Sequence, residues 1–162
     1  MVATGACGYA IDLTMLCNVK YHPEKFRAAT YRLQKTSGSV QIFGNGSLVF
    51  LGQKSTAESQ VSLQELETML IEQGYTKFKD RTLTVRNIVV SVKTKPLNLS
   101  TVYEKLRLIE ANVSYETELF PGLIVKFPTF TCTMFTSGKI NVTGLKDVDD
   151  IGLVKSYIKP LI

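Results

Sequence analysis

The feature that most constrains the fold of this chain is an internal repeat. The segment 41–54, QIFGNGSLVFLGQK, resembles the segment 133–146, TMFTSGKINVTGLK, at an offset of 92 residues. Phe26 in YHPEKF and Phe120 in ETELF form a further pair at an offset of 94 residues. A duplicated unit has to bury its apolar residues in the same way twice, so each half is expected to repeat one order of strands and helices.

The composition restricts the class of protein. A chain of 162 residues with 44% hydrophobic residues suits one domain, or two small halves that share a core. It has no run of 18 apolar residues that could span a membrane, and no charged region precedes an apolar stretch at the N-terminus. The three widely spaced cysteines and the lone His22 suggest neither a disulfide framework, a zinc site nor a catalytic group. We therefore expect no enzyme, cofactor, metal or small-molecule substrate.

The charge of the chain is modestly basic and uneven. The net charge is +5, of which residues 1–80 contribute +1 and residues 81–162 contribute +4. Such an excess favours a polyanionic partner without establishing one.

The pattern of apolar residues predicts the order β-α-β-β-β-α in each half. In the first half we expect a short helix over 12–19, capped by Asp12, and a long helix over 55–73. Ser55 and Glu58 match a capping box, in which the serine accepts an orphan N–H and the glutamate reaches back. In the second half we expect a helix that starts at Asn98 and buries Ile109, and a last helix that starts at Asp147.

The strands also predict two unlike faces. Apolar residues of one parity, such as Ile88, Val90 and Val92, suit the face that the helices cover. The other parity mixes phenylalanine and valine with threonine, asparagine and lysine. A sheet face that is neither packed by helices nor fully polar is a candidate binding surface.

At these residues the chain resembles the TATA-box-binding protein family. The segments SYETELFPGLI (114–124), MFTSGK (134–139), VTG-K (142–146) and RNIV (86–89) are similar to the second repeat of that family. The segments VAT (2–4), YHPEKFRAA (21–29) and LGQKS (51–55) resemble its first repeat more loosely. The resemblance implies an α+β saddle: a curved antiparallel sheet of about ten strands, with helices on the convex face and DNA on the concave face. Residues 1–82 and 83–162 would be its two repeats, which together form one compact domain.

The resemblance also implies a set of DNA-binding residues. The wedges that enter between base pairs would be Phe26, Phe43, Phe120 and Phe135. The positions that face the floor of the minor groove would be Val2, Val49, Asn87, Val89, Asn141 and Thr143. The positions that contact the DNA backbone would be Arg32, Lys54, Lys126, Ser137, Lys139 and Lys146.

Several positions depart from the family pattern. The first-repeat asparagine has no counterpart before Val2, and Leu51 replaces a groove-facing threonine. Asn141 replaces a valine, while Thr133 and Gln41 each replace a leucine. This groove surface is more polar than the family pattern, so we expect weaker intrinsic DNA affinity and reliance on a partner.

The same resemblance implies protein partners. Glu116, Glu118 and Leu119 match the segment that contacts a IIB-like transcription factor, which would bring in the RNA polymerase machinery. The helix after Ser55 is acidic where the family helix is basic, which predicts a loss or change of the partners that bind there. The expected location is the nucleus, or the site of viral transcription for a viral source. The alternative function is a saddle-shaped scaffold or regulator of transcription with little or no DNA binding of its own.

Overall fold

The computed structural model describes residues 1–162, which form two compact units, Met1–Arg86 and Asn87–Ile162. The elements that begin in the first unit are β1 (Val2–Ala6), β2 (Val19–Lys20), β3 (Ala28–Arg32), β4 (Ser39–Phe43), β5 (Ser47–Leu51), α1 (Thr56–Glu72) and β6 (Thr84–Lys93), and β6 contains the boundary. The second unit continues with α2 (Leu99–Leu108), β7 (Asn112–Ser114), β8 (Gly122–Lys126), β9 (Thr131–Phe135), β10 (Lys139–Leu145) and α3 (Asp150–Ile158). No helix is long and apolar enough to cross a membrane.

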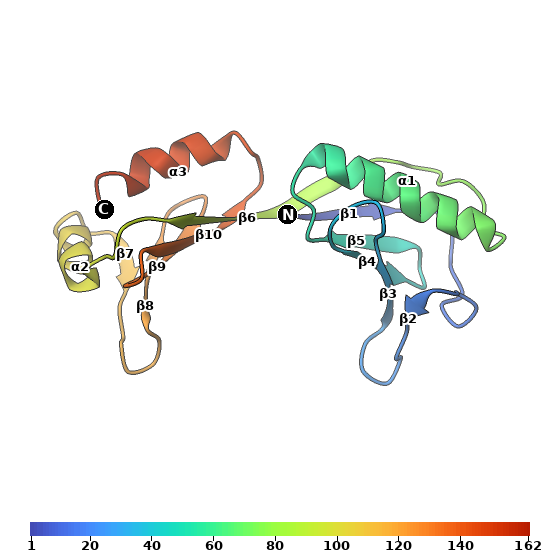
Figure 1. Ribbon diagram of the computed structural model, residues 1–162, viewed down its shortest axis with the longest axis horizontal. Coiled ribbons are helices and arrows are strands. Elements are labelled where there is room, and N and C mark those ends of the chain that lie inside the picture. The colour runs from blue at the N-terminus through green and yellow to red at the C-terminus, as the bar shows by residue number, and fades with distance from the viewer. The chain divides into compact units, whose positions relative to one another are not determined.

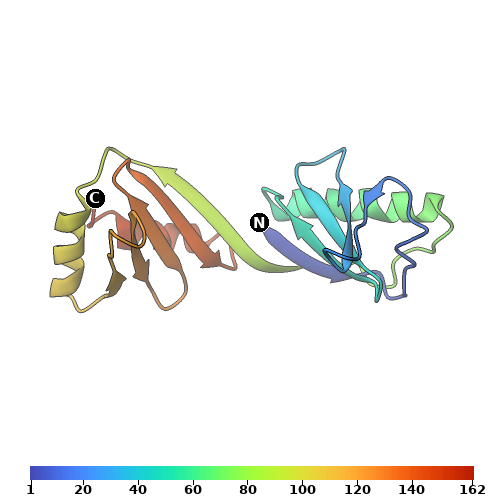
Figure 2. The ribbon, with the colours of Figure 1, turned by 90° about the horizontal axis from the view of Figure 1, so that it is seen from below.

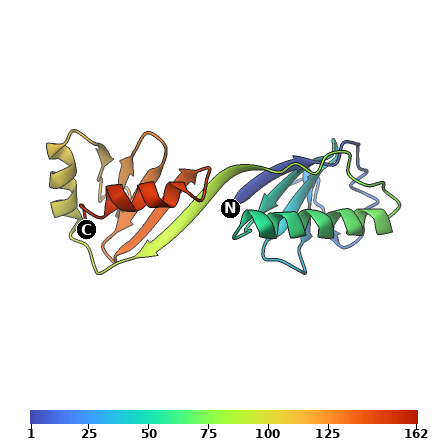
Figure 3. The ribbon, with the colours of Figure 1, turned by 90° about the horizontal axis from the view of Figure 1, so that it is seen from above.

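In the first unit the strands follow the order β2-β3-β4-β5-β1, and every neighbouring pair is antiparallel. Alternate residues are buried, so that Val40 and Ile42 of β4 face Leu48 and Phe50 of β5 on the covered side. The helix α1 covers this side, and its Leu66 and Leu70 belong to the same core (Figures 1 and 3). The opposite side of the strands carries no helix, and we call it the open face of the first unit (Figure 2).

The second unit repeats this layout with the order β6-β10-β9-β8-β7. The helix α3 lies on the covered side and buries Val154 and Ile158, while α2 packs at the outer edge against β7 and β8 (Figure 1). The opposite side is again without a helix, and we call it the open face of the second unit. The fold class expected from the sequence, α+β with antiparallel strands and helices on one face, is confirmed.

Two local expectations are wrong. Residues 12–18 form turns and bends instead of a helix, and Val19 begins β2. The Asp12 carboxylate accepts hydrogen bonds from the backbone N–H (3.0 Å) and the hydroxyl (2.6 Å) of Thr14. Aspartate that bonds two residues ahead favours a turn over a helix. Ile109 is 68% exposed, because α2 ends at Leu108 and the chain leaves the core there.

The last helix begins three residues later than expected. The side chain of Asp147 accepts a hydrogen bond from the backbone N–H of Asp149 (3.1 Å), which forms a turn ahead of the helix. The helix α3 then starts at Asp150. It has 9 residues, compared with 17 in α1, so it covers less of its sheet.

The start of α1 follows half of the expected capping box. The Ser55 hydroxyl accepts from the N–H of Glu58 (3.1 Å), as expected. The Glu58 carboxylate, however, accepts from the hydroxyl (2.7 Å) and N–H (2.9 Å) of Ser37 and from the N–H of Lys54 (2.6 Å). The bond from Ser37 is the main reason that the pKa of Glu58 falls to about 2. Glu58 therefore holds the β3–β4 turn against the helix instead of closing the cap.

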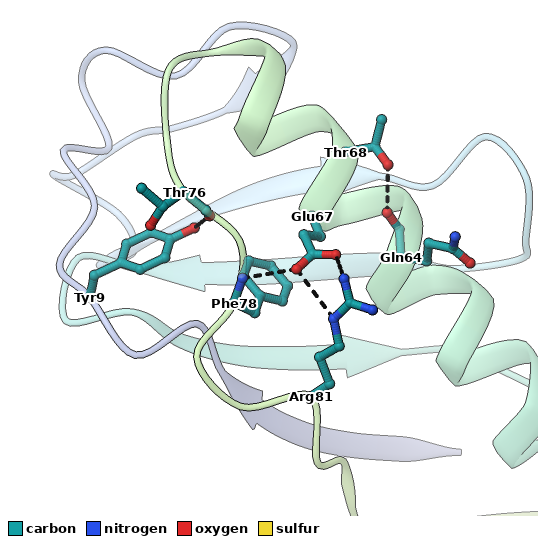
Figure 4. Close-up of polar contacts among 7 residues, drawn as sticks. All are labelled: Tyr9, Gln64, Glu67, Thr68, Thr76, Phe78 and Arg81. Carbon is teal, nitrogen blue, oxygen red and sulfur yellow. Dashed lines mark hydrogen bonds and ion pairs between the residues drawn. The ribbon is translucent and has the colours of Figure 1, made fainter.

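Two further glutamates of α1 hold loops in the same way. Glu65 accepts hydrogen bonds from the backbone N–H groups of Gln34 (2.7 Å) and Lys35 (2.9 Å). Glu67 accepts from the N–H of Phe78 (2.8 Å) and forms an ion pair with Arg81 (Figure 4). The acidic residues of this helix are thus not only a solvated face, because three of them supply acceptors to the chain around them.

Removal of the Glu67 carboxylate is expected to destabilise the first unit. Glu67 is 5% exposed, and Glu67→Ala leaves the buried N–H of Phe78 without an acceptor. We expect the free energy of unfolding to fall by about 1–3 kcal/mol, and by less in Glu67→Gln, which keeps an acceptor. The measurement is urea unfolding followed by circular dichroism. Glu72→Ala, on the exposed face of the same helix, serves as the control and should stay within about 0.5 kcal/mol; equal losses in both variants would contradict this account.

Candidate nucleic-acid interface

The first unit holds two phenylalanine rings together on its open face. Phe26 lies on the loop between β2 and β3, where the backbone N–H groups of Lys25 and Phe26 both donate to the carbonyl of His22 at 2.9 Å. Phe43 is the last residue of β4. The two ring centroids are 6.1 Å apart at an interplanar angle of 69°. Phe26 is 45% exposed, so an apolar edge faces solvent here without a partner from the chain.

The second unit builds the same pair from equivalent residues. In the loop between β7 and β8, the N–H groups of Leu119 and Phe120 donate to the carbonyl of Glu116 at 3.0 and 2.9 Å. Phe135 ends β9, and its ring centroid is 5.8 Å from that of Phe120 at an angle of 65°. Phe120 is 39% exposed. The structure therefore brings the four expected wedge residues together as two pairs, one in each unit.

Small residues make room for both pairs. Ala28 pairs with Phe43 across β3 and β4, and Gly122 pairs with Phe135 across β8 and β9. A Cβ atom on Gly122 would lie 2.6 Å from the Phe120 ring and 3.1 Å from the Phe135 ring. The sequence analysis does not identify Gly122. Gly122 follows Phe120 by two residues, as Ala28 follows Phe26, and this shared spacing of a small residue could have indicated its role.

Asn87 has its polar groups divided between the chain and the solvent. Its side-chain oxygen accepts a hydrogen bond from the backbone N–H of Gly144 (2.9 Å), where β10 departs from regular pairing and Gly144 has φ of +95°. Since a backbone N–H can only donate, the amide oxygen must point to it, and the NH₂ group is left as a donor on the open face.

Asn141 is arranged in a similar way. It pairs with Ser91 across β10 and β6, and the Ser91 hydroxyl donates to the Asn141 side-chain oxygen (2.8 Å). Its NH₂ group is thereby also left as a donor. The second open face thus presents two amide donors, from Asn87 and Asn141, beside the exposed Thr143.

The remaining groove-facing candidates also lie on the open faces. Val2 and Val49 are half-buried in neighbouring strands of the first unit, and Val89 of β6 is 49% exposed. The positions that depart from the family pattern share these faces. These positions are all half-buried and lie within strands: Gln41, Leu51, Thr133 and Asn141.

The six candidates for contact with a nucleic-acid backbone are all exposed: Arg32, Lys54, Lys126, Ser137, Lys139 and Lys146. None of the five basic residues among them takes part in an ion pair. Their charges are therefore available to a partner.

Lys93 is a candidate that the sequence analysis missed. It pairs directly with Lys139 across β6 and β10, and both side chains are exposed. Like charges opposite each other destabilise a strand pair unless an anion lies between or near them. Lys93 could not be recognised before the register was known, because it is 46 residues from Lys139 in sequence.

The candidate protein-binding residues occupy the tip of the β7–β8 loop. Glu116 and Glu118 are exposed, and neither forms an ion pair. Leu119, which precedes Phe120, is 81% exposed. An exposed leucine beside two carboxylates suits a partner with an apolar pocket and a basic rim.

The histidine, cysteine and carboxylate side chains do not gather into a metal-binding cluster, and Cys132 is buried. No three histidine, cysteine, aspartate or glutamate side chains lie close enough to hold a metal ion. Burial raises the pKa of the Cys132 thiol to about 12, which keeps it protonated within the core of the second unit.

Comparisons with known proteins agree on one family. The family described as transcription factor TFIID, or TATA-binding protein, matches residues 1–72 and 82–162. The TATA-box-binding protein of Methanothermobacter thermautotrophicus is 32% identical over 160 residues, which cover 94% of this chain and 86% of that protein. The TATA-box-binding protein of Saccharomyces cerevisiae is 32% identical over 171 residues, which cover all of this chain and 69% of that protein. The solved structure of Methanococcus jannaschii TBP matches 99% of this chain with a TM-score of 0.80 and 26% identity, over 93% of its own length.

The chain therefore belongs to the TATA-binding protein family, as its motifs indicated. The family is one of transcription factors and not of enzymes.

Proposed function

We propose that this chain is a transcription initiation factor that binds TATA-like promoter DNA through the minor groove, with one phenylalanine pair of each unit wedged between base pairs. The observation that carries the proposal is the repeated pair of exposed rings, Phe26 with Phe43 and Phe120 with Phe135, each on a face without a helix. A single exposed phenylalanine is common on protein surfaces, but the same pair built twice by equivalent residues is not accounted for by packing.

The wedges have a physical rationale. A phenylalanine ring is flat, rigid and apolar, so it can enter between base pairs at the cost of roughly a few kcal/mol of stacking per step. This family is itself a known example of that mode of binding, and the stacking cost given above describes the family rather than this chain. The cost is offset because bent DNA meets a broader protein surface, and flexible TA steps lower it.

The amide donors suit the floor of the minor groove. A·T base pairs present only acceptors there, adenine N3 and thymine O2. In Asn87 and Asn141 the side-chain oxygen is held by the chain and the NH₂ group remains, which matches that pattern. The second unit keeps more of these groups than the first, so we expect it to set the orientation of the protein on DNA.

A partner would complete the function. The polar residues Gln41, Thr133 and Asn141 leave less apolar surface to meet the groove, and lower affinity of the isolated chain follows. We infer that a IIB-like factor binds the loop of Glu116, Glu118 and Leu119 and recruits RNA polymerase to the promoter, in the nucleus if the source is eukaryotic.

Loss of one ring pair should reduce DNA bending. On circularly permuted duplexes, the native chain is expected to bend TATA-like DNA and not a scrambled duplex. Phe120→Ala combined with Phe135→Ala should reduce the position-dependent mobility shift without abolishing it, because one end of the site loses its wedges while the other end keeps them. Leu108→Ala, which removes an 84% exposed apolar side chain from the end of α2, is the control. Equal bending by all variants would refute wedging, and no shift with any duplex would favour the scaffold alternative.

Lys93 should contribute to the salt dependence of binding. Each phosphate neutralised by a lysine adds about 0.9 to the slope of log affinity against log salt concentration. Lys93→Ala is therefore expected to lower the slope by about 0.9, as Lys139→Ala should, when binding is measured by fluorescence anisotropy at several salt concentrations. Lys105→Ala, which removes a lysine of α2 away from the open face, is the control and should leave the slope unchanged. An unchanged slope in Lys93→Ala would remove Lys93 from the interface.

Charge reversal on the β7–β8 loop should weaken partner recruitment alone. Glu116→Lys with Glu118→Lys is expected to lower the affinity of a IIB-like factor for the protein–DNA complex about tenfold, while DNA binding itself does not weaken. A gel-shift titration of the factor measures both. Glu104→Lys on α2 tests for a general charge effect. Unchanged recruitment would count against this contact.

A further inference from the structure

On the open face of the second unit, three polar side chains lie in one row across three neighbouring strands. Ser91 of β6 pairs with Asn141 of β10, and Asn141 pairs on its other side with Thr133 of β9. Ser91 is exposed, and Asn141 and Thr133 are half-buried. We call these three residues the polar row. Phe135 follows Thr133 by two residues in β9, so the polar row lies next to the row that holds the phenylalanine pair.

The equivalent row of the first unit has an apolar centre. Thr4 of β1 pairs with Val49 of β5, and Val49 pairs with Gln41 of β4. Val49 and Gln41 precede Asn141 and Thr133 by 92 residues, the offset of the repeat. The two units therefore present different chemistry at the same position of their open faces, with methyl groups in the first unit and an amide in the second.

One hydrogen bond determines which groups of the polar row can donate and which can accept. The Ser91 hydroxyl donates to the side-chain oxygen of Asn141 at 2.8 Å. A hydroxyl has a single hydrogen, so the Ser91 oxygen can act towards a ligand only as an acceptor while this bond is kept. If the hydrogen turned to a ligand instead, the half-buried oxygen of Asn141 would lose its donor, which costs free energy. The NH₂ group of Asn141 remains a donor, so the pair presents a donor beside an acceptor.

A donor beside an acceptor matches one kind of base pair in the minor groove. An A·T pair offers only the acceptors adenine N3 and thymine O2 there, whereas a G·C pair adds the N2 amino group of guanine, which is a donor. A protein acceptor that faces this amino group gains a hydrogen bond, and it gains none from an A·T pair. A valine in the same place leaves the amino group without a partner, and an unpaired donor that loses its water costs affinity.

We propose that Asn141 and Ser91 read a G·C base pair in the minor groove, so that this chain prefers a promoter element with one such pair close to the step that Phe120 and Phe135 enter. The inference rests on the proposed promoter binding and narrows its sequence. Asn141 donates to an acceptor on the groove floor, and Ser91 accepts from guanine N2. The Thr133 hydroxyl can donate or accept, so it opposes neither kind of base pair. Both orientations of the pair fit, because the minor groove distinguishes G·C from C·G poorly.

The experiment scans a TATA-like duplex with an added amino group in the minor groove. At one A·T pair at a time, adenine is replaced by 2,6-diaminopurine, which adds the amino group that guanine carries there. The affinity of the full chain for each duplex, relative to the unmodified duplex, is measured by fluorescence anisotropy. We expect a rise of about fivefold at one position near one end, as one gained hydrogen bond would give. We expect a loss at the other positions, including the one that meets Val49.

A second pair of duplexes isolates the amino group itself. A G·C pair placed at the preferred position should give the same gain. Replacement of its guanine by inosine, which lacks the amino group, should remove that gain. A gain that survives this replacement would overturn the inference, because it could not come from a hydrogen bond to the amino group.

Two substitutions test the residues. Ser91→Ala removes the acceptor, so the ratio of affinities at the preferred position should fall from about five to about one or below. Asn141→Val introduces the residue type of the first unit and should turn the gain into a loss. Ser100→Ala, which removes an exposed hydroxyl from α2, is the control and should leave the scan unchanged.

The outcomes separate this inference from the proposed function. Binding of the unmodified duplex, with a loss of affinity at every modified position, would overturn the inference and leave promoter binding intact. A gain that either Ser91→Ala or Asn141→Val leaves unchanged would do the same. Failure to bind any duplex would overturn the proposed function and this inference with it.

Discussion

The structure depends on the two-residue period of its strands. In each unit one set of side chains, such as Val40 and Ile42 or Cys132 and Met134, is buried under a helix, while the alternate set stays free of helices. Successive side chains of a strand point to opposite faces. Once the core positions of a strand are fixed, the residues between them must therefore all lie on the open face. The proposed wedges, the amide donors and the basic residues all belong to that alternate set or to the loops that extend it.

The two units share a plan but differ in how their helices are used. The long helix α1 holds three pieces of backbone through Glu58, Glu65 and Glu67. The helix α3 is about half as long and has lysines where α1 has Leu63 and Glu67. The open face of the second unit keeps more of the groups that we propose to contact DNA, namely Asn87, Asn141 and Thr143.

Much of the fold could be predicted because its signals are local. The Ser55 cap, the helix that follows it and the parity of β6 could be read from neighbouring residues, and the repeat was visible on comparing the two halves. The failures arise where a side chain acts across the fold or competes with its own backbone. Asp12 could cap a helix or form a turn, because its hydrogen bond from the N–H of Thr14 fits both, and Leu13 and Leu16 pack into the core from the turn. Glu58 binds Ser37, 21 residues away, instead of closing its cap. In the candidate site, the four phenylalanines were named as wedges because of the family resemblance. Lys93 beside Lys139 and the room provided by Gly122 could be found only from the strand register.

The central claim is that the paired rings enter between base pairs of DNA. The fluorescence of 2-aminopurine, which rises when this base loses stacking, can be measured at each end of a TATA-like duplex. We predict a rise at both ends with the native chain, and loss of the rise at one end only when Phe120 and Phe135 are both replaced by alanine. Tight binding with no rise at either end, or a rise that the substitutions do not alter, would contradict the claim.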